Sequence, residues 1–188
     1  MNYHGKRITL RAIEQSDLEL LQQWSNDRSI NYQLGGWHFP SSKRDQQKWF
    51  DSLSVHSNDQ RFAIQSDYGD LIGMANLVSI NWKDGNAIHG MLLGDTENRG
   101  KGYGVDTIMT IGKYAFEELG LKRLDTTIIA YNEASLGVYM NKCGWKQEGI
   151  KKDYYFRKNK RWDQVILGIT AEDYAALVNE NGYWADEA

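Results

Sequence analysis

The sequence predicts an α/β protein of the mixed α+β kind, in which helices flank a sheet. Short alternating runs typical of strands dominate residues 61–93, and beyond residue 100 helix-like and strand-like segments alternate. A glycine-rich stretch at residues 97–104 leads directly into a run with helical periodicity. The length of 188 residues is that of one domain. We expect this domain to span residues 1–188, with a core of about residues 7–170.

The N-terminal part is expected to form one strand and two helices. Residues 8–13 alternate between polar and apolar side chains, as in a strand. Residues 16–19 have the pattern of a capping box, so the first helix should begin there. Residues 31–40 indicate an aromatic loop that contains two glycines and the only proline. Ser41 or Ser42 can then cap a second helix.

The rest of the chain is expected to bring the sheet to six or seven strands. A long helix should follow the glycine-rich stretch and end before Gly120, because glycine commonly follows a helix C-terminus. The further strands are expected at residues 61–65, 71–80, 87–93, 124–129, 145–156 and 161–169, and the further helices at 102–119, 132–142 and 171–179.

Composition argues against several classes of protein. The net charge of −3 counts against a general nucleic-acid binder. No apolar run approaches the roughly 18 residues of a membrane span, and the N-terminus lacks an apolar signal core, so we expect a cytoplasmic protein without membrane contact. Cys143 is the only cysteine and the four histidines lack metal-ligand spacing, so we expect no disulfide and no metal.

The stretch at residues 97–104 carries glycines at alternate positions, together with Arg99 and Lys101. Glycine lets the backbone turn with a positive φ and approach a ligand closely. Because a helix follows, free N–H groups and the positive dipole end would favour an anion, and the stretch predicts a pyrophosphate-binding loop. Its spacing fits neither a Walker A loop nor the dinucleotide fingerprint. An ordinary glycine-rich turn before a helix is the alternative.

Three segments resemble one family. Arg99, Gly102 and Gly104 resemble the acetyl-CoA motif R/Q-x-x-G-x-G/A of the Gcn5-related N-acetyltransferases, the GNAT superfamily. Residues 129–145 resemble its block N-x-x-A/S-x-x-x-Y-x-x-x-G-F/W, and residues 162–163 the Y-x-D hairpin of the ribosomal-protein N-terminal and spermidine acetyltransferases. The resemblance covers nearly the whole chain. It implies a single-domain GNAT fold, whose mostly antiparallel sheet is splayed into a V between its fourth and fifth strands.

The resemblance implies acetyl-CoA as the cosubstrate. One strand would pair its backbone with the pantetheine at the edge that the splay exposes. In the second block, four polar residues share a helical face by their spacing, and they are candidates for the pantetheine or, for the lysine, the phosphates. A solvated lysine is the alternative there. The implied cofactor-binding residues are Met91, Leu92, Leu93, Arg99, Gly100, Lys101, Gly102, Tyr103, Gly104, Asn132, Ser135, Tyr139 and Lys142.

Acetyl transfer to an amine also requires proton transfers. By its place in the second block, Tyr139 is the expected general acid for the departing CoA thiolate; the alternative is a core tyrosine. The family's usual base, a carboxylate on the strand before Met91, is missing from residues 87–90. His89 is the candidate replacement, since the pKa of an unperturbed histidine lies near 6.5, and a buried structural histidine is the alternative.

The acceptor site of the superfamily usually involves the first two helices and their connection. Here this connection carries Tyr32, Trp37, His38 and Phe39, our candidate substrate-binding residues. No carboxylate occurs from Arg28 to Arg44, which counts against spermidine because a polycation needs compensating charge. Aromatic residues suit sugars, nucleotides or peptide ends, or they simply pack the loop.

We therefore expect an acetyl-CoA-dependent N-acetyltransferase acting on a primary amine by direct attack. The acceptor could be a protein N-terminus, an amino sugar, an antibiotic or a polyamine. The alternatives are a non-catalytic acyl-CoA-binding or sensing domain of the same fold and, more remotely, a nucleotide-binding regulatory domain. We expect no nucleic-acid partner, while assembly into a homodimer or a higher homo-oligomer stays open.

Overall fold

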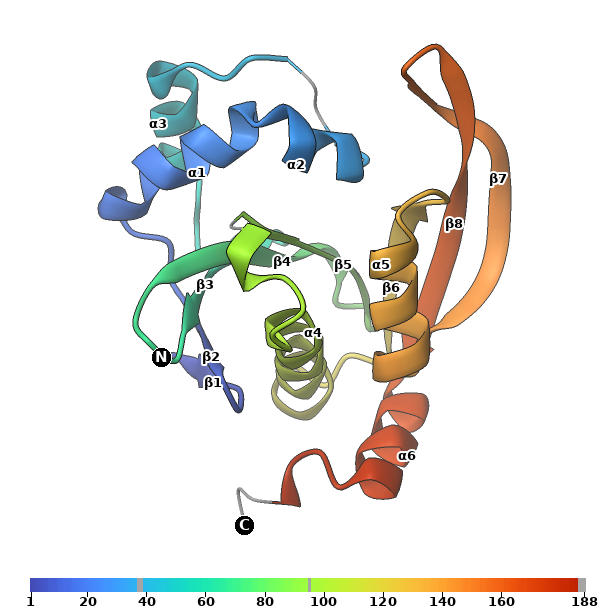
Figure 1. Ribbon diagram of the computed structural model, residues 1–188. Helices are drawn as coiled ribbons and strands as arrows, with labels where there is room; N and C mark the ends of the chain where they lie inside the picture. Colours follow the sequence, from blue (N-terminus) through green and yellow to red (C-terminus); the bar gives the residue numbers. More distant parts are fainter. Residues whose placement is uncertain (37–38, 95, 186–188) are drawn as a thin grey trace.

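The computed structural model describes residues 1–36, 39–94 and 96–185. Among these residues, eight strands form one sheet in the order β1-β2-β3-β4-β5-β6-β8-β7 (Figure 1). The strands are β1 (Tyr3–His4), β2 (Ile8–Arg11), β3 (Gln60–Ser66), β4 (Leu71–Asn81), β5 (Asn86–Leu93), β6 (Arg123–Ile129), β7 (Lys146–Arg157) and β8 (Lys160–Thr170).

The sheet is antiparallel except where β5 meets β6. These two strands pair in parallel through residues 86–88 and 123–125, and within the described strands they are not paired beyond Ile88 and Asp125. Because β6 continues along β8 as far as Ile129, its far end leaves β5 and opens a gap in the sheet. The predicted splay between the fourth and fifth strands, which are β5 and β6, is confirmed.

Helices cover both faces of this sheet (Figure 1). α1, α2 and α3 lie on one face around a small core that includes Leu21, Trp24 and Ile30. α4 and the later helices pack on the other face around the main core. The helices are η1 (Gln15–Asp17), α1 (Leu18–Asn26), α2 (Arg28–Gln33), α3 (Lys43–Asp51), η2 (Thr96–Asn98), α4 (Tyr103–Lys113), η3 (Tyr114–Glu118), α5 (Glu133–Gly137), η4 (Val138–Lys142) and α6 (Ala171–Asn181).

The eight strands of the described sheet exceed by one the upper end of our prediction of six or seven. The additional strand, β1, has only two residues, and it returns to β2 through a turn in which the N–H of Gly5 donates to the carbonyl of Ile8 at 2.8 Å. So short a strand leaves too little alternation in the sequence to be recognised.

Two features of the N-terminal helices also differ from the prediction. The first capping box uses Glu14 and Asp17 instead of residues 16–19, because Asp17 is held by Arg11 at 2.7 Å and accepts the N–H of Glu14 at 2.8 Å. Residues 31–33, predicted as loop, complete α2. This helix begins after Asp27, whose carboxylate accepts the first free N–H groups of the helix.

The two long helices after the glycine stretch both change from α-helix to π-helix along their length. α4 continues into the π-helical turn η3, and α5 continues into the π-helical turn η4. Gly120 follows η3 with a φ of 67°, so the predicted role of a glycine after the helix C-terminus is confirmed. In the described part of the chain, no helix combines the length and the apolar character needed to cross a membrane.

Candidate functional site

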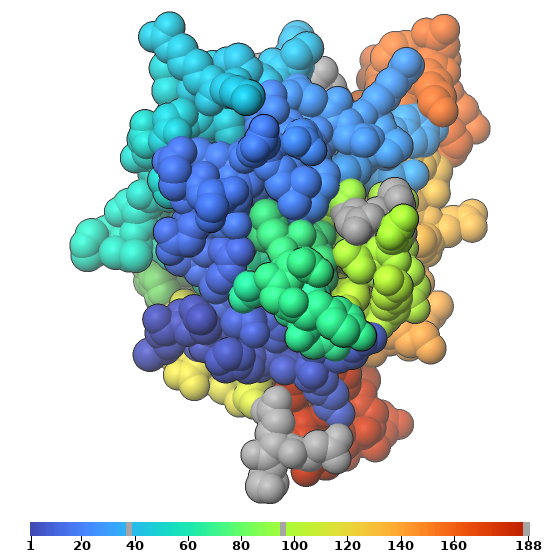
Figure 2. All heavy atoms as spheres, turned by 60° about the vertical axis from the view of Figure 1, so that its left-hand side comes forward, coloured from blue at the N-terminus to red at the C-terminus, as the bar shows by residue number. Residues whose placement is uncertain are grey.

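The glycine-rich loop has the backbone shape of an anion site. Gly102 is the N-cap of α4 with a φ of 89°, and Gly100 has a φ of 76°. A Cβ built on either glycine would meet no atom within 4 Å, so open space adjoins both residues. Gly102 has no side chain that could cap α4, and the first N–H groups of a helix lack partners within the helix. The loop therefore fits a phosphate group, and it lies at the surface in the yellow-green region of Figure 2.

Residues distant in the sequence hold this loop in place through hydrogen bonds. The Arg7 guanidinium donates to the carbonyl of Lys101 at 2.7 Å and to Asp67 at 3.0 Å. The Tyr103 hydroxyl donates to the same carboxylate at 2.7 Å, and both hydrogen bonds lower the pKa of Asp67, that from Tyr103 most. The Tyr103 side chain is buried, so its backbone N–H is the part that can face a ligand. Arg99 and Lys101 are exposed, as a phosphate contact requires.

The segment 91–93 of β5 lies beside the loop, and one of its edges has no strand partner among the described residues. Its other edge pairs with β4, whereas the pairing between β5 and β6 ends before this segment, at Ile88. A Cβ on Gly104 would lie 3.3 Å from Met91 and 3.8 Å from Leu93, so the first turn of α4 packs on these side chains. Leu92 points to the opposite face and joins the core of α1 and α3. The backbone edge is thus free for an extended ligand between the two faces.

Tyr139 lies at the vertex of the splay. His89 and Thr126 are the first residues of β5 and β6 beyond their paired stretch. The Tyr139 ring lies 5.8 Å from the His89 ring and 5.1 Å from the Trp145 ring, centroid to centroid. Its pKa is influenced by a side-chain hydrogen bond with Thr126. The predicted acid and the predicted base therefore lie together, at the point where the two strands separate.

The His89 imidazole is fully buried and neutral. Nδ1 lies 3.0 Å from the carbonyl oxygen of Asn76, so Nδ1 carries the proton and Nε2 is an acceptor. Nε2 has no hydrogen-bond partner among the described residues. Burial lowers the pKa of His89 to about 4. A group with so low a pKa is a weak base at neutral pH, which counts against the role of general base that we expected.

Tyr139 is a neutral phenol. Burial raises its pKa above the ordinary value of 10, the neighbouring Cys143 adds to the rise, and the hydrogen bond with Thr126 opposes it. Burial likewise raises the pKa of Cys143 to about 12, so this thiol stays protonated and packs in the core. Tyr139 thus keeps its proton at every physiological pH.

The chain has one residue more than the family pattern between Tyr139 and the next glycine. The pattern places three residues there, whereas four stand between Tyr139 and Gly144. The additional residue is accommodated by η4, where the N–H of Cys143 donates to the carbonyl of Val138. This π-turn also breaks the polar face that we predicted from α-helical spacing: Tyr139 and Cys143 are buried together, whereas Lys142 is exposed.

Asn132 and Ser135 stand at the start of α5, after the far end of β6. The Asn132 side chain caps α5 by accepting the N–H of Ser135 at 3.2 Å, and its amide donates to the carbonyl of Gln33 at 3.2 Å. The end of α2 is therefore tied to the start of α5 across the opening of the sheet. Both residues remain partly exposed.

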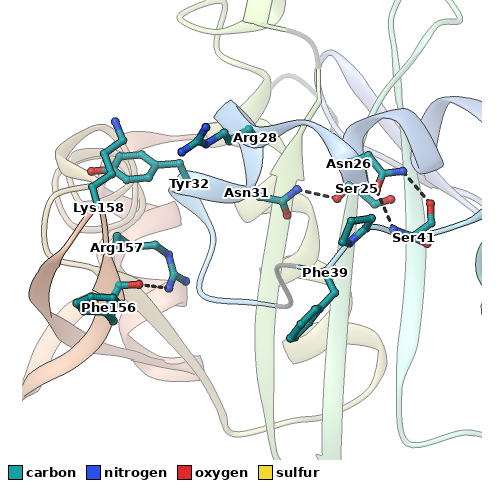
Figure 3. Close-up of a pocket in the computed structure, with 11 residues that line it drawn as sticks. Ser25, Asn26, Arg28, Asn31, Tyr32, Phe39, Ser41, Phe156, Arg157 and Lys158 are labelled. Atoms are coloured by element: carbon teal, nitrogen blue, oxygen red, sulfur yellow. Dashed lines mark hydrogen bonds between the residues drawn. The ribbon is translucent and has the colours of Figure 1, made fainter.

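Two connected cavities lie on the side of α1 and α2. The outer cavity, of about 670 Å³, is enclosed by α1, α2, the segment 39–41 and the tip of the β7–β8 hairpin (Figure 3). The inner cavity, of about 290 Å³, continues between α1, α3 and the sheet as far as Leu92. The residues Ser25, Asn31, Phe39 and Ser41 line both. Because Leu92 belongs to the segment next to the glycine loop, the cavities lead from solvent toward that segment.

Of the four predicted acceptor residues, Tyr32 and Phe39 line the outer cavity, while Trp37 and His38 lie outside the described residues. The Tyr32 ring stacks on Tyr131 at 4.6 Å, and the Lys158 ammonium lies 4.3 Å above it. The cavity is also lined by Arg28 and by three hairpin residues, Phe156, Arg157 and Lys158, which we did not predict. The run of cations at residues 157–161 was a visible signal, but only the fold brings it to α2.

The described residues contain no group of histidine, cysteine or acidic side chains that could hold a metal ion. The site instead combines an uncapped glycine loop, a free strand edge, a buried phenol and a cavity that approaches from the opposite face. Residues 10–166 match the family model of the acetyltransferase (GNAT) domain, and the chain belongs to this family. The predicted enzyme class, a GNAT-type acyltransferase, is confirmed.

Two relatives and one solved structure are similar to this chain over most of its length. The chain is 28% identical over 171 residues to an SPbeta prophage-derived uncharacterized N-acetyltransferase, YokL, of Bacillus subtilis, covering 90% of this chain and 93% of the relative. It is 26% identical to spermidine N(1)-acetyltransferase of Vibrio cholerae, covering 90% and 96%. A crystal structure of spermidine N-acetyltransferase from Vibrio cholerae in complex with CoA and spermine has a TM-score of 0.83 at 23% identity, covering 89% and 98%, and shows the same fold. GNAT enzymes use acetyl-CoA, the cosubstrate that we predicted.

Proposed function

We propose that this protein transfers the acetyl group of acetyl-CoA to a primary amine, by direct attack of the amine on the thioester. The observation that carries the proposal is that Tyr139 lies against His89 and Thr126, where β5 and β6 separate, in a fold that also has an uncapped glycine loop at the start of α4. The loop at residues 99–104 would hold the pyrophosphate through backbone N–H groups and the exposed side chains of Arg99 and Lys101. The free edge of segment 91–93 would hold the pantetheine.

The chemical step needs little more than this arrangement. The amine nitrogen forms a bond to the thioester carbon, and the carbon–sulfur bond breaks as the tetrahedral intermediate collapses. The Tyr139 hydroxyl donates its proton to the departing thiolate. The attacking nitrogen loses one proton to water, and one proton returns to Tyr139 from solvent. Asn132 and Ser135, at the start of α5, are candidate hydrogen-bond partners for the pantetheine, and the exposed Lys142, at the end of η4, is a candidate contact for the phosphates.

His89 fits the site better as a neutral hydrogen-bond acceptor than as a strong base. Its Nε2 lone pair is buried and faces no described donor, and the ring lies against Tyr139. We therefore propose that His89 receives a proton only transiently, or orders a water molecule near the amine. Titration of this group near neutral pH is not part of the mechanism, since its pKa is about 4.

The acceptor would enter through the two cavities, with Tyr32 and Phe39 along its path. The relative from Vibrio cholerae is a spermidine N(1)-acetyltransferase, so a polyamine is the first acceptor to test. The decisive experiment combines calorimetric titration of CoA with detection of released thiol over a panel of spermidine, amino sugars and peptides. Saturable CoA binding with amine-dependent thiol release supports the proposal. Binding without release by any amine would instead favour a non-catalytic acyl-CoA sensor.

A cytoplasmic location and self-association belong to the same proposal. Cys143 is a free, buried thiol, as is usual in a reducing compartment. β7 ends the sheet, and it carries exposed Ile150, Tyr154 and Phe156. Such an edge is suited to pairing with a second copy in a homodimer or a larger homo-oligomer. Light scattering after size-exclusion chromatography gives the oligomeric state directly.

A further inference from the structure

The outer cavity is positively charged although the chain as a whole is acidic. Its described lining contains Arg28, Arg157 and Lys158, and none of the described lining residues is a carboxylate. The three cations come from α2 and from the hairpin tip, and Figure 3 shows them along the mouth around Tyr32. Between residues 151 and 163 the hairpin carries six lysine and arginine residues against two aspartates. A cavity with walls of one sign concentrates ligands of the opposite sign.

Two of the three positive charges, those of Arg157 and Lys158, are held in place. The Arg157 guanidinium donates to the carbonyl of Phe156 at 2.9 Å and to that of Leu34 at 3.3 Å. Lys158 lies 4.3 Å above the ring of Tyr32. Arg28 is exposed at the first position of α2, and the nearby carboxylate of Asp27 is engaged by Ser29 at 2.7 Å and by Ile30 at 3.1 Å.

The inner cavity carries the opposite charge. Asp45 is the one ionisable residue in its described lining, and hydrogen bonds from Ser42 lower the pKa of this carboxylate. The Asp45 carboxylate, in the first turn of α3, therefore attracts an amine to the cavity that extends to Leu92. A second positive charge on the same molecule would have to remain beside Arg28 and Lys158, where like charges repel.

We propose that the acceptor is a primary amine whose remainder carries a negative charge, a carboxylate or a phosphate, which binds between Arg28, Arg157 and Lys158. This inference rests on the proposed function and names its substrate class. It sets the chain apart from enzymes that act on polyamines. The exposed Arg28 can bind a planar or tetrahedral anion through paired N–H groups, whereas Arg157, whose terminal N–H groups donate to backbone carbonyls, contributes positive charge. The aromatic rings beside these cations cover the apolar part of the acceptor.

The test uses short alkyl amines that differ mainly in the charge of the far group: aminopropyl phosphate, β-alanine, aminopropanol and diaminopropane, with spermidine added. We expect kcat/KM for an anionic amine to exceed that for diaminopropane by at least about tenfold, and the advantage to shrink in high salt. The ratio of aminopropyl phosphate to β-alanine distinguishes phosphate from carboxylate. Higher kcat/KM for diaminopropane or spermidine would overturn the inference.

Substitution of exposed cavity residues identifies the groups that cause the preference for anionic amines. Arg28→Gln and Lys158→Gln should each reduce the preference for the anionic amines about fivefold, the effect of one exposed ion pair. Lys83→Gln, in the turn between β4 and β5, is the matched control and should leave the preference unchanged. A preference that both cavity variants retain would contradict the assignment. Calorimetric binding of the same amines to the CoA complex reports the preference even without turnover, so failure of the inference and failure of the proposed function are distinguishable.

Discussion

The Arg7 guanidinium, next to β2, donates a 2.7 Å hydrogen bond to the carbonyl oxygen of Lys101 in the glycine-rich loop. The same side chain pairs with Asp67 and lies over the Tyr103 ring at 4.7 Å. The loop is thereby fixed before any ligand arrives. Pre-organisation of this kind reduces the entropy that binding would otherwise cost.

We predict that Arg7→Gln weakens CoA binding about three- to tenfold, because the Lys101 carbonyl loses its partner and the loop becomes freer. The melting temperature should change little, since the side chain is partly exposed. Calorimetry measures the Kd, and Arg44→Gln on α3 is the control. Unchanged affinity in Arg7→Gln would show that the loop keeps its shape without this contact.

A second prediction concerns Gly102. Gly102→Val places a branched side chain at a φ of 89°, in the space where the phosphate should lie. We expect a loss of roughly 1–2 kcal/mol of stability from backbone strain and a Kd for CoA at least about tenfold higher, because the phosphate can no longer approach the helix N-terminus.

Gly120→Val is a closely matched control for that strain. Gly120 also has a positive φ, 67°, and open space around a built Cβ, but it follows η3 away from the loop. The Gly120→Val variant should lose a comparable amount of stability and retain its affinity for CoA. Equal affinities in the two variants would mean that the loop does not bind the pyrophosphate.

The third prediction concerns the carboxylate of Asp106, which is 2% exposed on α4. It accepts the backbone N–H groups of Lys6, Arg7 and Ile8 at 2.7–3.0 Å, together with the Tyr183 hydroxyl at 2.8 Å. Asp106→Asn turns one acceptor into a donor that faces other donors. We expect a loss of about 2–4 kcal/mol in the free energy of unfolding, measured with urea. Asp84→Asn, in an exposed turn, is the control, and an equally small loss in both would refute the buried network.

Much of the fold followed from local patterns in the sequence. Two glycine patterns predicted the ends of the long helix: the alternating glycines before its periodic run and Gly120 after that run. Gly102 and Gly120, at the two ends, both have positive φ values. The splay came from the family resemblance. No local pattern contains it, since it depends on where β6 stops pairing with β5.

The parts that were not predicted depend on tertiary contacts or on a change of helical register. Residues 31–33 looked like an aromatic loop, yet the cap by Asp27 and the stacking of Tyr32 on Tyr131 hold them in α2. The polar face predicted for Tyr139 assumed an α-helix throughout, and η4 changes it. The charged cavity joins Arg28 to Lys158, which no spacing rule relates.

A fourth prediction follows from the burial of His89. Its pKa is 6.5 when unperturbed and about 4 in the folded protein, so between these values the unfolded chain binds more protons. Stability should therefore be fully present above about pH 6.5 and should fall as the pH drops toward 4, by an amount on the order of 3 kcal/mol. Carboxylates influence the slope of the free energy of unfolding against pH least between pH 5 and 6.5, so the effect of His89 is clearest there.

Urea unfolding between pH 5 and 7.5 measures this slope. His89→Gln should be less stable at pH 7, because the packing against Tyr139 and Trp145 changes, but its stability should depend less on pH. His56→Gln, in an exposed turn, should keep the parent slope. A parent protein whose stability is flat across this range would show that His89 is not held in the neutral form.

The last prediction concerns Tyr139, which lies 5.8 Å from His89 where β5 and β6 separate. Tyr139→Phe removes only the hydroxyl and its contact with Thr126, so the ring still packs against Trp145 at the same place. Without the proton donor, the CoA thiolate must leave as an anion from a desolvated site. We expect turnover to fall by about 10²–10⁴-fold, typical for loss of a general acid, while CoA affinity and melting temperature stay nearly unchanged.

Thr126→Val separates the chemical role of Tyr139 from packing. It removes the partner of the hydroxyl but leaves the phenol, so turnover should fall far less than in Tyr139→Phe. Steady-state thiol release together with the Kd for CoA gives both quantities in each variant. If Tyr139→Phe keeps most of its turnover, the thiolate takes its proton from water. If Tyr139→Phe instead melts many degrees lower than Thr126→Val, the main contribution of Tyr139 is to the core, because a proton donor that serves catalysis alone leaves the folded state as stable as before.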